Sequence, residues 1–441
     1  MKIRSLHLVN YRGHADLPVD FEPGFNVVVG ANGSGKTSLL KAVCDACCGF
    51  TSYLGAPNDG YEPLSEENVA HVRMEAINGL YRFEQRFPVR VEADGDAFGR
   101  PVSWGVQLDS QLSDGAVWPD GNAPGLIFHD MQTQAAQGST NATPLDLPVI
   151  AFYRAHRHWL QAVPGQMAAA LAKDSRLDGY GNWSDAALDS NALLTWTIGK
   201  CLERFQTSSE TGVAFGDINS DELALVNNAL ATAVEGIRCL RYDLKQKSLL
   251  VEWVGGQNGP REPTAFENLS DGQRAVVCLI SDIARRMCLL NPQLGSDVTT
   301  KTNGIVLIDE FDLHLHPRWQ RILTSGLKRA FPSVQFIVAS HSPQVLGELE
   351  AEEIILLRPG QVDHPQVSYG LTSNQVLQEI MGADSRTPEV EHRLNAVFEH
   401  LERGELELAR AGIASLDSDA PGIPDLAGAR ALLRRKELIG R

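Results

Sequence analysis

Short runs of apolar residues recur along the chain, and each predicts a β-strand buried in the core. The clearest runs lie at 27–29, 147–153, 304–308, 334–339 and 354–357. Runs that are apolar at almost every position are typical of strands covered on both faces, as in a parallel sheet. We therefore predict an α/β fold with a central, mostly parallel sheet.

Alternating polar and apolar positions predict a second kind of sheet in the first third of the chain. Residues 2–10 alternate in this way, and so do two shorter runs at 71–77 and 80–87. The segments around these two runs are rich in Gly, Pro and Asp, which favour turns and loops. This pattern indicates an antiparallel β-lobe. We expect the Gln-, Ser-, Thr- and Asn-rich piece at 132–143 to be a loop.

Helical periodicity marks much of the remaining chain. It is clearest at 190–205 and 220–235, and it returns from about 372 to the last residue. No sustained heptad pattern accompanies it, which argues against a long coiled-coil arm. We therefore divide the chain into an N-terminal lobe, a helical insertion, a C-terminal lobe and a helical extension, at 1–159, 160–236, 237–371 and 372–441.

Composition narrows the class of protein. The 441 residues, 43% of them hydrophobic, are enough for two or three cores, and no apolar run is long enough to span a membrane. Seven cysteines at irregular spacing fit a reducing compartment, so we expect a soluble, cytoplasmic protein. A formal net charge of −16 argues against a protein that coats nucleic acid, and any contact with DNA would need a local basic patch.

The strand at 27–29 runs directly into a phosphate-binding loop. The sequence GANGSGKTS at 30–38 matches the pattern G-x-x-x-x-G-K-[ST], with a helical run after it. Glycines allow the backbone to curl so that its N–H groups face phosphate oxygens, and the helix dipole adds positive charge. Lys36 would reach the β- and γ-phosphates, and the Thr37 hydroxyl would ligate Mg²⁺. We predict nucleotide contacts from Gly30, Asn32, Gly33, Ser34, Gly35, Lys36, Thr37 and Ser38.

Three later motifs would complete a site for nucleotide hydrolysis. Asp309 and Glu310 end the apolar run at 304–308; Asp309 would hold Mg²⁺ through water and Glu310 would polarise the attacking water. His341 follows the run at 334–339, and we expect it to contact the γ-phosphate at the same sheet edge. A Ser/Gly turn at 270–273 opens a helix and would be a second anion-binding device in the chain.

These motifs together resemble the ABC-type ATPases of the RecF, Rad50 and SMC group. The matching pieces are Y-R-G-H at 11–14, the phosphate loop, L-S-D-G-Q at 269–273, the strand ending in Asp309-Glu310, and A-S-H-S-P at 339–343. The chain is further similar to a bacterial AAA family related to the ATPase subunits of Septu and Septu-like retron anti-phage systems. Segments that carry this similarity include IDEFDLHLHP at 308–317 and RALLRRKEL at 430–438.

The resemblance implies that one chain cannot form the complete ATP site alone. In these families ATP is bound between two head-to-tail subunits, so Ser270, Gly272 and Gln273 of one copy would close over ATP held by the other. Arg12 would lie beside the nucleotide phosphates. A homodimer or larger homo-oligomer is implied, with a separately encoded HNH-type nuclease as partner and no membrane. The alternative is a RecF-like repair ATPase that binds duplex DNA.

The chain also departs from its relatives at particular positions. His316 stands where transporter ATPases usually carry an Asp, and His314 precedes it. Gln132 and Gln134 are the candidates for the glutamine that such ATPases place near the metal. The basic and aromatic cluster at 154–159 could face nucleotide or nucleic acid, or it could be a solvated loop.

Overall fold

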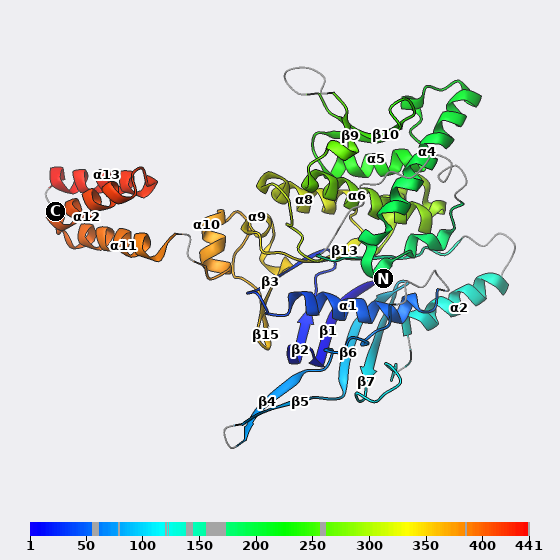
Figure 1. Ribbon diagram of the computed structural model, residues 1–441, viewed down its shortest axis with the longest axis horizontal. Coiled ribbons are helices and arrows are strands. Elements are labelled where there is room, and N and C mark those ends of the chain that lie inside the picture. The colour runs from blue at the N-terminus through cyan, green and yellow to red at the C-terminus, as the bar shows by residue number, and fades with distance from the viewer. Residues whose placement is uncertain are drawn as a thin grey trace. The chain divides into compact units, whose positions relative to one another are not determined.

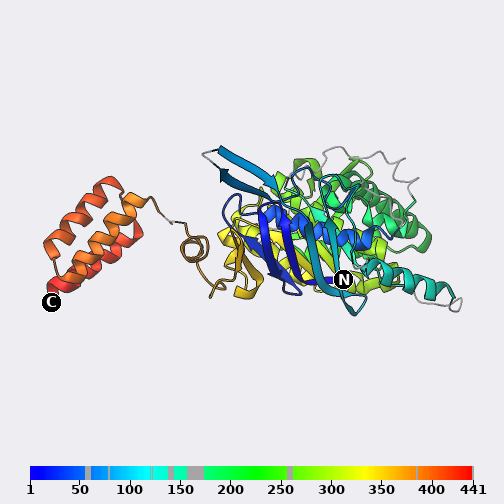
Figure 2. The ribbon, with the colours of Figure 1, turned by 90° about the horizontal axis from the view of Figure 1, so that it is seen from below.

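The computed structural model describes residues 1–54, 61–77, 80–119, 121, 123–137, 144–155, 173–255, 262–383 and 386–439. The described chain divides into two compact units, Met1–Leu371 and Thr372–Arg441. Ribbon views show the elements of each unit (Figures 1 and 2). None of the described helices is both long enough and apolar enough to cross a bilayer.

A six-stranded sheet forms the centre of the larger unit. Its strand order is β15-β14-β3-β13-β12-β8, and every neighbouring pair is parallel except β14 with β15. Each residue of the four inner strands and of the outer strand β8 is buried except Arg358, as expected for strands covered on both faces. The strands are β3 (Phe25–Val29), β8 (Val149–Tyr153), β12 (Gly304–Ile308), β13 (Val334–Ala339), β14 (Ile354–Arg358) and β15 (Gln361–Asp363).

A four-stranded antiparallel sheet forms the predicted β-lobe. Its order is β2-β1-β6-β7, and helix α1 (Lys36–Thr51) contacts strands of both this sheet and the central one. Alternate residues of β1 and β6 are buried, because only one face of this sheet is covered by the core. A separate hairpin, β4 with β5, projects from the lobe (Figure 1). The strands are β1 (Lys2–Tyr11), β2 (His14–Asp20), β4 (Val72–Ile77), β5 (Leu80–Gln85), β6 (Val89–Ala97) and β7 (Arg100–Leu108).

Helices and a three-stranded sheet (β11-β10-β9) form the rest of this unit. Helix α6 contacts α4, α5 and strand β8, while α8 contacts α5 and α9. The Asp221 carboxylate caps α5 by accepting from the amide of Ala224. The elements are α4 (Ser190–Thr211), α5 (Glu222–Ala233), α6 (Asp271–Leu290), α7 (Val298–Lys301), α8 (Pro317–Ala330), α9 (Pro343–Leu346), β9 (Ile237–Asp243), β10 (Ser248–Trp253) and β11 (Thr264–Ala265).

Helix α2 (Ala123–Gln137) corrects the sequence prediction of a loop at 132–143. The prediction gave too much weight to polar composition: glutamine is a good helix former, and the segment also holds several alanines. Pro124 at the start is itself a helix-initiating signal, because its fixed φ suits the first turn. Residues 138–143 lie outside the described chain.

The smaller unit has a hydrophobic core of its own. Nine buried residues of α11, α12 and α13 form this core, and Leu394, Val397 and Ile413 are among them. The sequences of these helices are amphipathic, and their apolar stripes face one another. The unit contains α10 (Ser373–Gln375), α11 (Pro388–Arg403), α12 (Leu406–Asp419) and α13 (Pro424–Ile439).

Candidate functional site

The carboxyl ends of β3, β13 and β12 lie side by side, because these strands are parallel neighbours in the central sheet. They carry the phosphate loop, the His341 loop and the Asp309-Glu310 pair, so residues far apart in sequence meet at one sheet edge. A pocket of about 310 Å³ opens there. Its lining residues are Asn32, Gly33, Gly35, Lys36, Thr37, Ser38, Asp309, Glu310, Ala339 and His341.

The phosphate loop is shaped by glycines in positions that no other residue could fill without strain. Gly35 has φ of +98°, and a Cβ there would lie 2.2 Å from Nε2 of the buried His14. A Cβ on Gly30 would lie 2.4 Å from the carbonyl oxygen of Leu357 on β14. The loop is therefore held between the β1–β2 turn and the central sheet, and α1 begins directly after it.

Lys36 is buried at the centre of this loop. Its Nζ donates to the carbonyl oxygens of Gly30 at 2.9 Å and Ala31 at 3.0 Å. Burial lowers the pKa of Lys36, while the nearby carboxylates of Asp309 and Glu310 act in the opposite direction. Among the described residues, Ser34 Oγ is buried without a hydrogen-bond partner. An ammonium group and an unpaired hydroxyl in a glycine-shaped loop fit phosphate oxygens.

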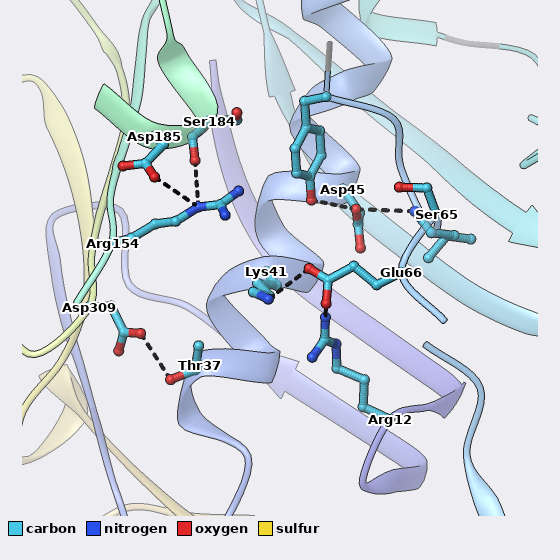
Figure 3. Close-up of polar contacts among 12 residues, drawn as sticks. Arg12, Thr37, Lys41, Asp45, Ser65, Glu66, Arg154, Ser184, Asp185 and Asp309 are labelled. Atoms are coloured by element: carbon cyan, nitrogen blue, oxygen red, sulfur yellow. Dashed lines mark hydrogen bonds and ion pairs between the residues drawn. The ribbon is translucent and has the colours of Figure 1, made fainter. Parts of the chain in front are cut away.

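The Thr37 hydroxyl donates to Asp309 Oδ2 at 2.9 Å, which joins the phosphate loop to the end of β12 (Figure 3). The hydroxyl of Thr37 and the carboxylate of Asp309 supply hard oxygen atoms of the kind that Mg²⁺ prefers. Glu310 is exposed in the pocket, and its backbone has φ of +47°. Its amide donates to Asp309 Oδ1 at 3.1 Å. The donor set therefore fits a magnesium ion held by Thr37 and Asp309.

His341 faces the same pocket from the end of β13. Its backbone amide donates to Asp312 Oδ1 at 3.1 Å, and the same oxygen accepts from Ser340 Oγ at 2.6 Å. Partial burial and the positive charge of Lys36 lower the pKa of His341, which favours the neutral imidazole. A neutral ring can donate one hydrogen bond to a phosphate oxygen.

Arg12 lies outside the pocket lining and is already paired. Its guanidinium forms an ion pair with Glu66, whose other oxygen accepts from Lys41 Nζ at 2.7 Å (Figure 3). The guanidinium also lies over the ring of Tyr11, 5.8 Å from the ring centre. The backbone of Arg12 has φ of +49°. Glu66 occupies one end of the guanidinium, so a nucleotide phosphate would have to share Arg12 with this carboxylate or replace it.

The signature residues 270–273 lie away from the pocket lining of their own chain. Ser270 caps α6: its Oγ accepts from the Gln273 amide at 3.3 Å, and Gln273 Oε1 accepts from the Ser270 amide at 3.1 Å. Gly272 is buried, and a Cβ there would lie 2.3 Å from the carbonyl oxygen of His314. The N-terminus of α6 therefore packs against the turn that follows Glu310.

The remaining sequence candidates are not brought into the pocket. Gln132 and Gln134 are exposed on α2 and do not line it. Arg154 Nε donates to the Ser184 carbonyl oxygen at 3.0 Å and lies 3.8 Å from Asp185 Oδ2 (Figure 3). Residues 156–159 of the basic cluster lie outside the described chain.

Sequence reasoning missed two residues that support the site. Asp312 accepts hydrogen bonds from the His341 loop. Glu66 forms ion pairs with both Arg12 and Lys41. Asp312 offered a signal, since it is a third carboxylate two positions after Glu310 at a strand end. Glu66 offered none, because its partners are 54 and 25 positions away.

Two known families match the chain. Residues 5–114 match the family described as "AAA domain", and residues 213–347 match "AAA domain, putative AbiEii toxin, Type IV TA system". These segments include the phosphate loop and the Asp309-Glu310 pair. Among solved structures, an SMC head bound to the C-terminal winged-helix domain of ScpA covers 82% of this chain and 97% of its own, with a TM-score of 0.46 and 15% identity.

Two relatives match along most of their length. The "Retron Ec83 probable ATPase" of Escherichia coli is 27% identical over 434 residues, which covers 88% of this chain and 78% of the relative. The "Septu protein PtuA" of Bacillus thuringiensis is 31% identical over 415 residues, which covers 88% of this chain and 86% of the relative. The chain is an ATPase of the AAA class, and it belongs to the family of the Septu protein PtuA.

Proposed function

We propose that this chain binds MgATP between two copies of itself, and that ATP hydrolysis gates an anti-phage complex with a separately encoded HNH-type nuclease. The observation that supports this most directly is the division of the site. Lys36, Thr37, Asp309, Glu310 and His341 gather at one pocket, while residues 270–273 lie outside it. A second copy would supply the missing signature.

Five side chains of the pocket have a role in the proposed hydrolysis. Lys36 and the loop amides bind the phosphates, and His341 donates a hydrogen bond to a γ-phosphate oxygen. Thr37 and Asp309 would hold Mg²⁺, which would supply positive charge beside the phosphate oxygens. Glu310 accepts a proton from the attacking water in line with the γ-phosphate. Loss of the γ-phosphate then removes the contacts that join the two copies.

The two relatives support the proposed biological role. They carry the names of a Septu and a retron system, and each match covers 88% of the chain rather than the phosphate loop alone. The acidic composition supports a protein partner over non-specific DNA binding. Turnover that is stimulated by duplex DNA and falls steeply with salt would instead favour the RecF-like alternative.

The Glu310→Gln variant tests the gating mechanism. It should still bind MgATP, because Lys36 and the loop are unchanged, but its turnover should fall by orders of magnitude. Light scattering should then show a MgATP-dependent dimer that persists. Glu352→Gln, a change at an exposed glutamate outside the pocket, should behave as the wild type. Full turnover in Glu310→Gln would remove Glu310 from its role.

A co-purification experiment tests the partner. The chain would be expressed with the HNH-type nuclease proposed as its partner, and the purified complex would be tested for DNA cleavage with and without ATP. We expect a stable complex whose cleavage depends on nucleotide. Two proteins that elute separately under every nucleotide condition would contradict the proposed partner and leave the ATPase mechanism intact.

A further inference from the structure

One side chain outside the pocket joins the two loops that carry Glu310 and His341. Gln320 is half-buried in the first turn of α8. Its Nε2 donates to the carbonyl oxygens of Asp312 at 3.2 Å and Leu315 at 3.0 Å. Its Oε1 accepts from Ser342 Oγ at 2.8 Å. A single carboxamide thus links the turn 309–316 to the loop 340–342.

A second link runs beside the first. The Asp312 carboxylate belongs to the turn 309–316, and it accepts from the hydroxyl of Ser340 and the amide of His341. Ser340 is fully buried, so its hydroxyl has no access to bulk solvent when this bond is lost. Because both links join the same two loops, the turn and the loop should move as one unit.

The far side of the turn 309–316 touches the signature. A Cβ on Gly272 would lie only 2.3 Å from the carbonyl oxygen of His314, so the two backbones are in close contact. His314 itself has φ of +61°. Contact this close leaves no space for the turn to shift without moving the start of α6. The turn is therefore held by His341 on one side and by Gly272 on the other.

We propose that Gln320 is a positioning residue for ATP hydrolysis. It holds the turn 309–316 and the loop 340–342 in one arrangement, so that Glu310 and His341 approach the γ-phosphate together. Through the contact with Gly272, the same arrangement sets the position of the signature that closes over the ATP of a second copy. This inference rests on the proposed function.

The chemistry of the carboxamide explains why glutamine suits this position. Two carbonyl oxygens need donors and one hydroxyl needs an acceptor, and a carboxamide supplies both. In Gln320→Glu, a carboxylate would face the same two carbonyl oxygens without a proton to donate. In Gln320→Leu, the side chain keeps a similar size but leaves all three polar groups without this partner. Both changes should loosen the connection between the two loops, because the bonds of Asp312 to Ser340 and His341 must then join them without Gln320.

Steady-state kinetics of Gln320→Leu test the inference. We expect kcat to fall roughly 10²-fold, because small displacements of catalytic groups have effects of that size. The Kd for MgATP should stay within a few-fold of the wild type, since Lys36 and the loop are untouched. In the Glu310→Gln background, Gln320→Leu should also reduce the fraction of MgATP-dependent dimer.

Gln344→Leu is a matched control. Gln344 also joins α8 to α9, through a bond from Arg321 Nε to its Oε1 at 2.5 Å, but its side chain makes no bond to either loop. It should keep the wild-type kcat. If Gln320→Leu does not fold, Ser342→Ala removes one bond of the link, and Ser342→Thr restores the hydroxyl. We then expect a lower kcat in Ser342→Ala and recovery in Ser342→Thr.

The outcomes separate this inference from the proposed function. A folded Gln320→Leu with wild-type kcat overturns the inference, and so does an equal loss in Gln344→Leu. A loss of MgATP affinity that accounts for the whole loss of activity overturns it as well. If instead the wild type does not hydrolyse ATP, or Glu310→Gln keeps full turnover, the proposed function itself fails.

Discussion

At the scale of single residues, the site stores backbone strain at Glu310. Its φ of +47° lies in the left-handed region, which costs a residue with a Cβ about 1–2 kcal/mol. The conformation turns the chain directly after the buried strand β12 and places Glu310 in the pocket. Strain of this kind persists where the surrounding structure imposes it, and here the Asp309 carboxylate accepts the Glu310 amide.

Comparison of two inactive variants tests this strain. Glu310→Gly and Glu310→Ala both lack the carboxylate, so both should lose turnover. Glu310→Gly should nevertheless be the more stable by about 1 kcal/mol, because glycine adopts positive φ at no steric cost. Urea unfolding of the two variants measures the difference. Equal midpoints would show that the left-handed backbone carries no strain.

The ion pair of Arg12 with Glu66 makes a second prediction at this scale. If Arg12 binds nucleotide phosphate, Glu66 competes with ATP for it. Glu66→Gln should then tighten MgATP binding by up to about 1 kcal/mol, the value of a partly exposed pair. Calorimetric titration measures this gain, and Arg12→Ala should abolish it. A Kd that is unaffected by either change would give Arg12 a purely structural role.

The buried Asp45 predicts a pH dependence of stability. It accepts from the hydroxyls of Tyr11 at 2.8 Å and Tyr61 at 2.7 Å, and burial raises its pKa from 3.8 to about 6. Because the folded state binds this proton more tightly, its contribution is full below pH 4 and is lost as pH rises through 6.

The loss should amount to roughly 3 kcal/mol for a shift of this size. Asp45→Asn has no proton to lose, so it isolates the contribution of Asp45 from that of other groups. Urea unfolding at several pH values should show the wild type losing stability relative to Asp45→Asn between about pH 4 and pH 6. A constant difference across that range would contradict the prediction.

At the scale of elements, a buried charge cluster fixes the signature helix α6 to the central sheet. Asp282 accepts from Tyr153 Oη at the end of β8 at 2.7 Å, and from Arg286 Nε at 2.7 Å. It also pairs with Arg285 at 2.9 Å, and Arg286 donates to the Gly179 carbonyl oxygen at 3.1 Å. The side chains of all three charged residues are at most 3% exposed.

Removing the carboxylate should therefore be severe. Asp282→Asn leaves two buried guanidinium groups without their anion, which typically costs 3–5 kcal/mol. Thermal or urea unfolding measures the loss. Asp297→Asn breaks a pair with Lys301 of 2.8 Å that is more than half exposed, and it should cost less than about 1 kcal/mol. Similar effects in both variants would contradict the role of the buried cluster.

The sequence predicted the elements whose pattern is local. The all-apolar runs predicted the inner strands and a mostly parallel sheet, whereas the order of the strands came only from the structure. Helix α2 was missed because polar composition hid good helix formers. The left-handed backbone of Glu310 and the hydrogen bonds of Gln320 could not be predicted from the sequence, because each depends on contacts that form only when distant segments meet.

At the scale of the whole molecule, the ATPase unit and the C-terminal unit each form a compact body. The pocket is lined entirely by residues before 342, and the core of the smaller unit is formed entirely by residues after 393. Within the described chain, the pocket contains no lining residue from the C-terminal unit, and that core contains no buried residue from the ATPase unit. We therefore expect nucleotide binding and the fold of the C-terminal helices to be separable.

Truncation after Leu371 tests this separation. The shortened chain should bind MgATP with the Kd of the full chain, because every pocket residue and both supporting loops remain. A peptide of residues 372–441 should give a helical circular dichroism spectrum and unfold cooperatively, since α11–α13 bury nine residues against one another. Its stability should be small, as for other domains of this size, so the unfolding is best followed at low temperature. Loss of MgATP binding in the shortened chain would show that the helices support the pocket. An unfolded peptide would show that they need the ATPase unit.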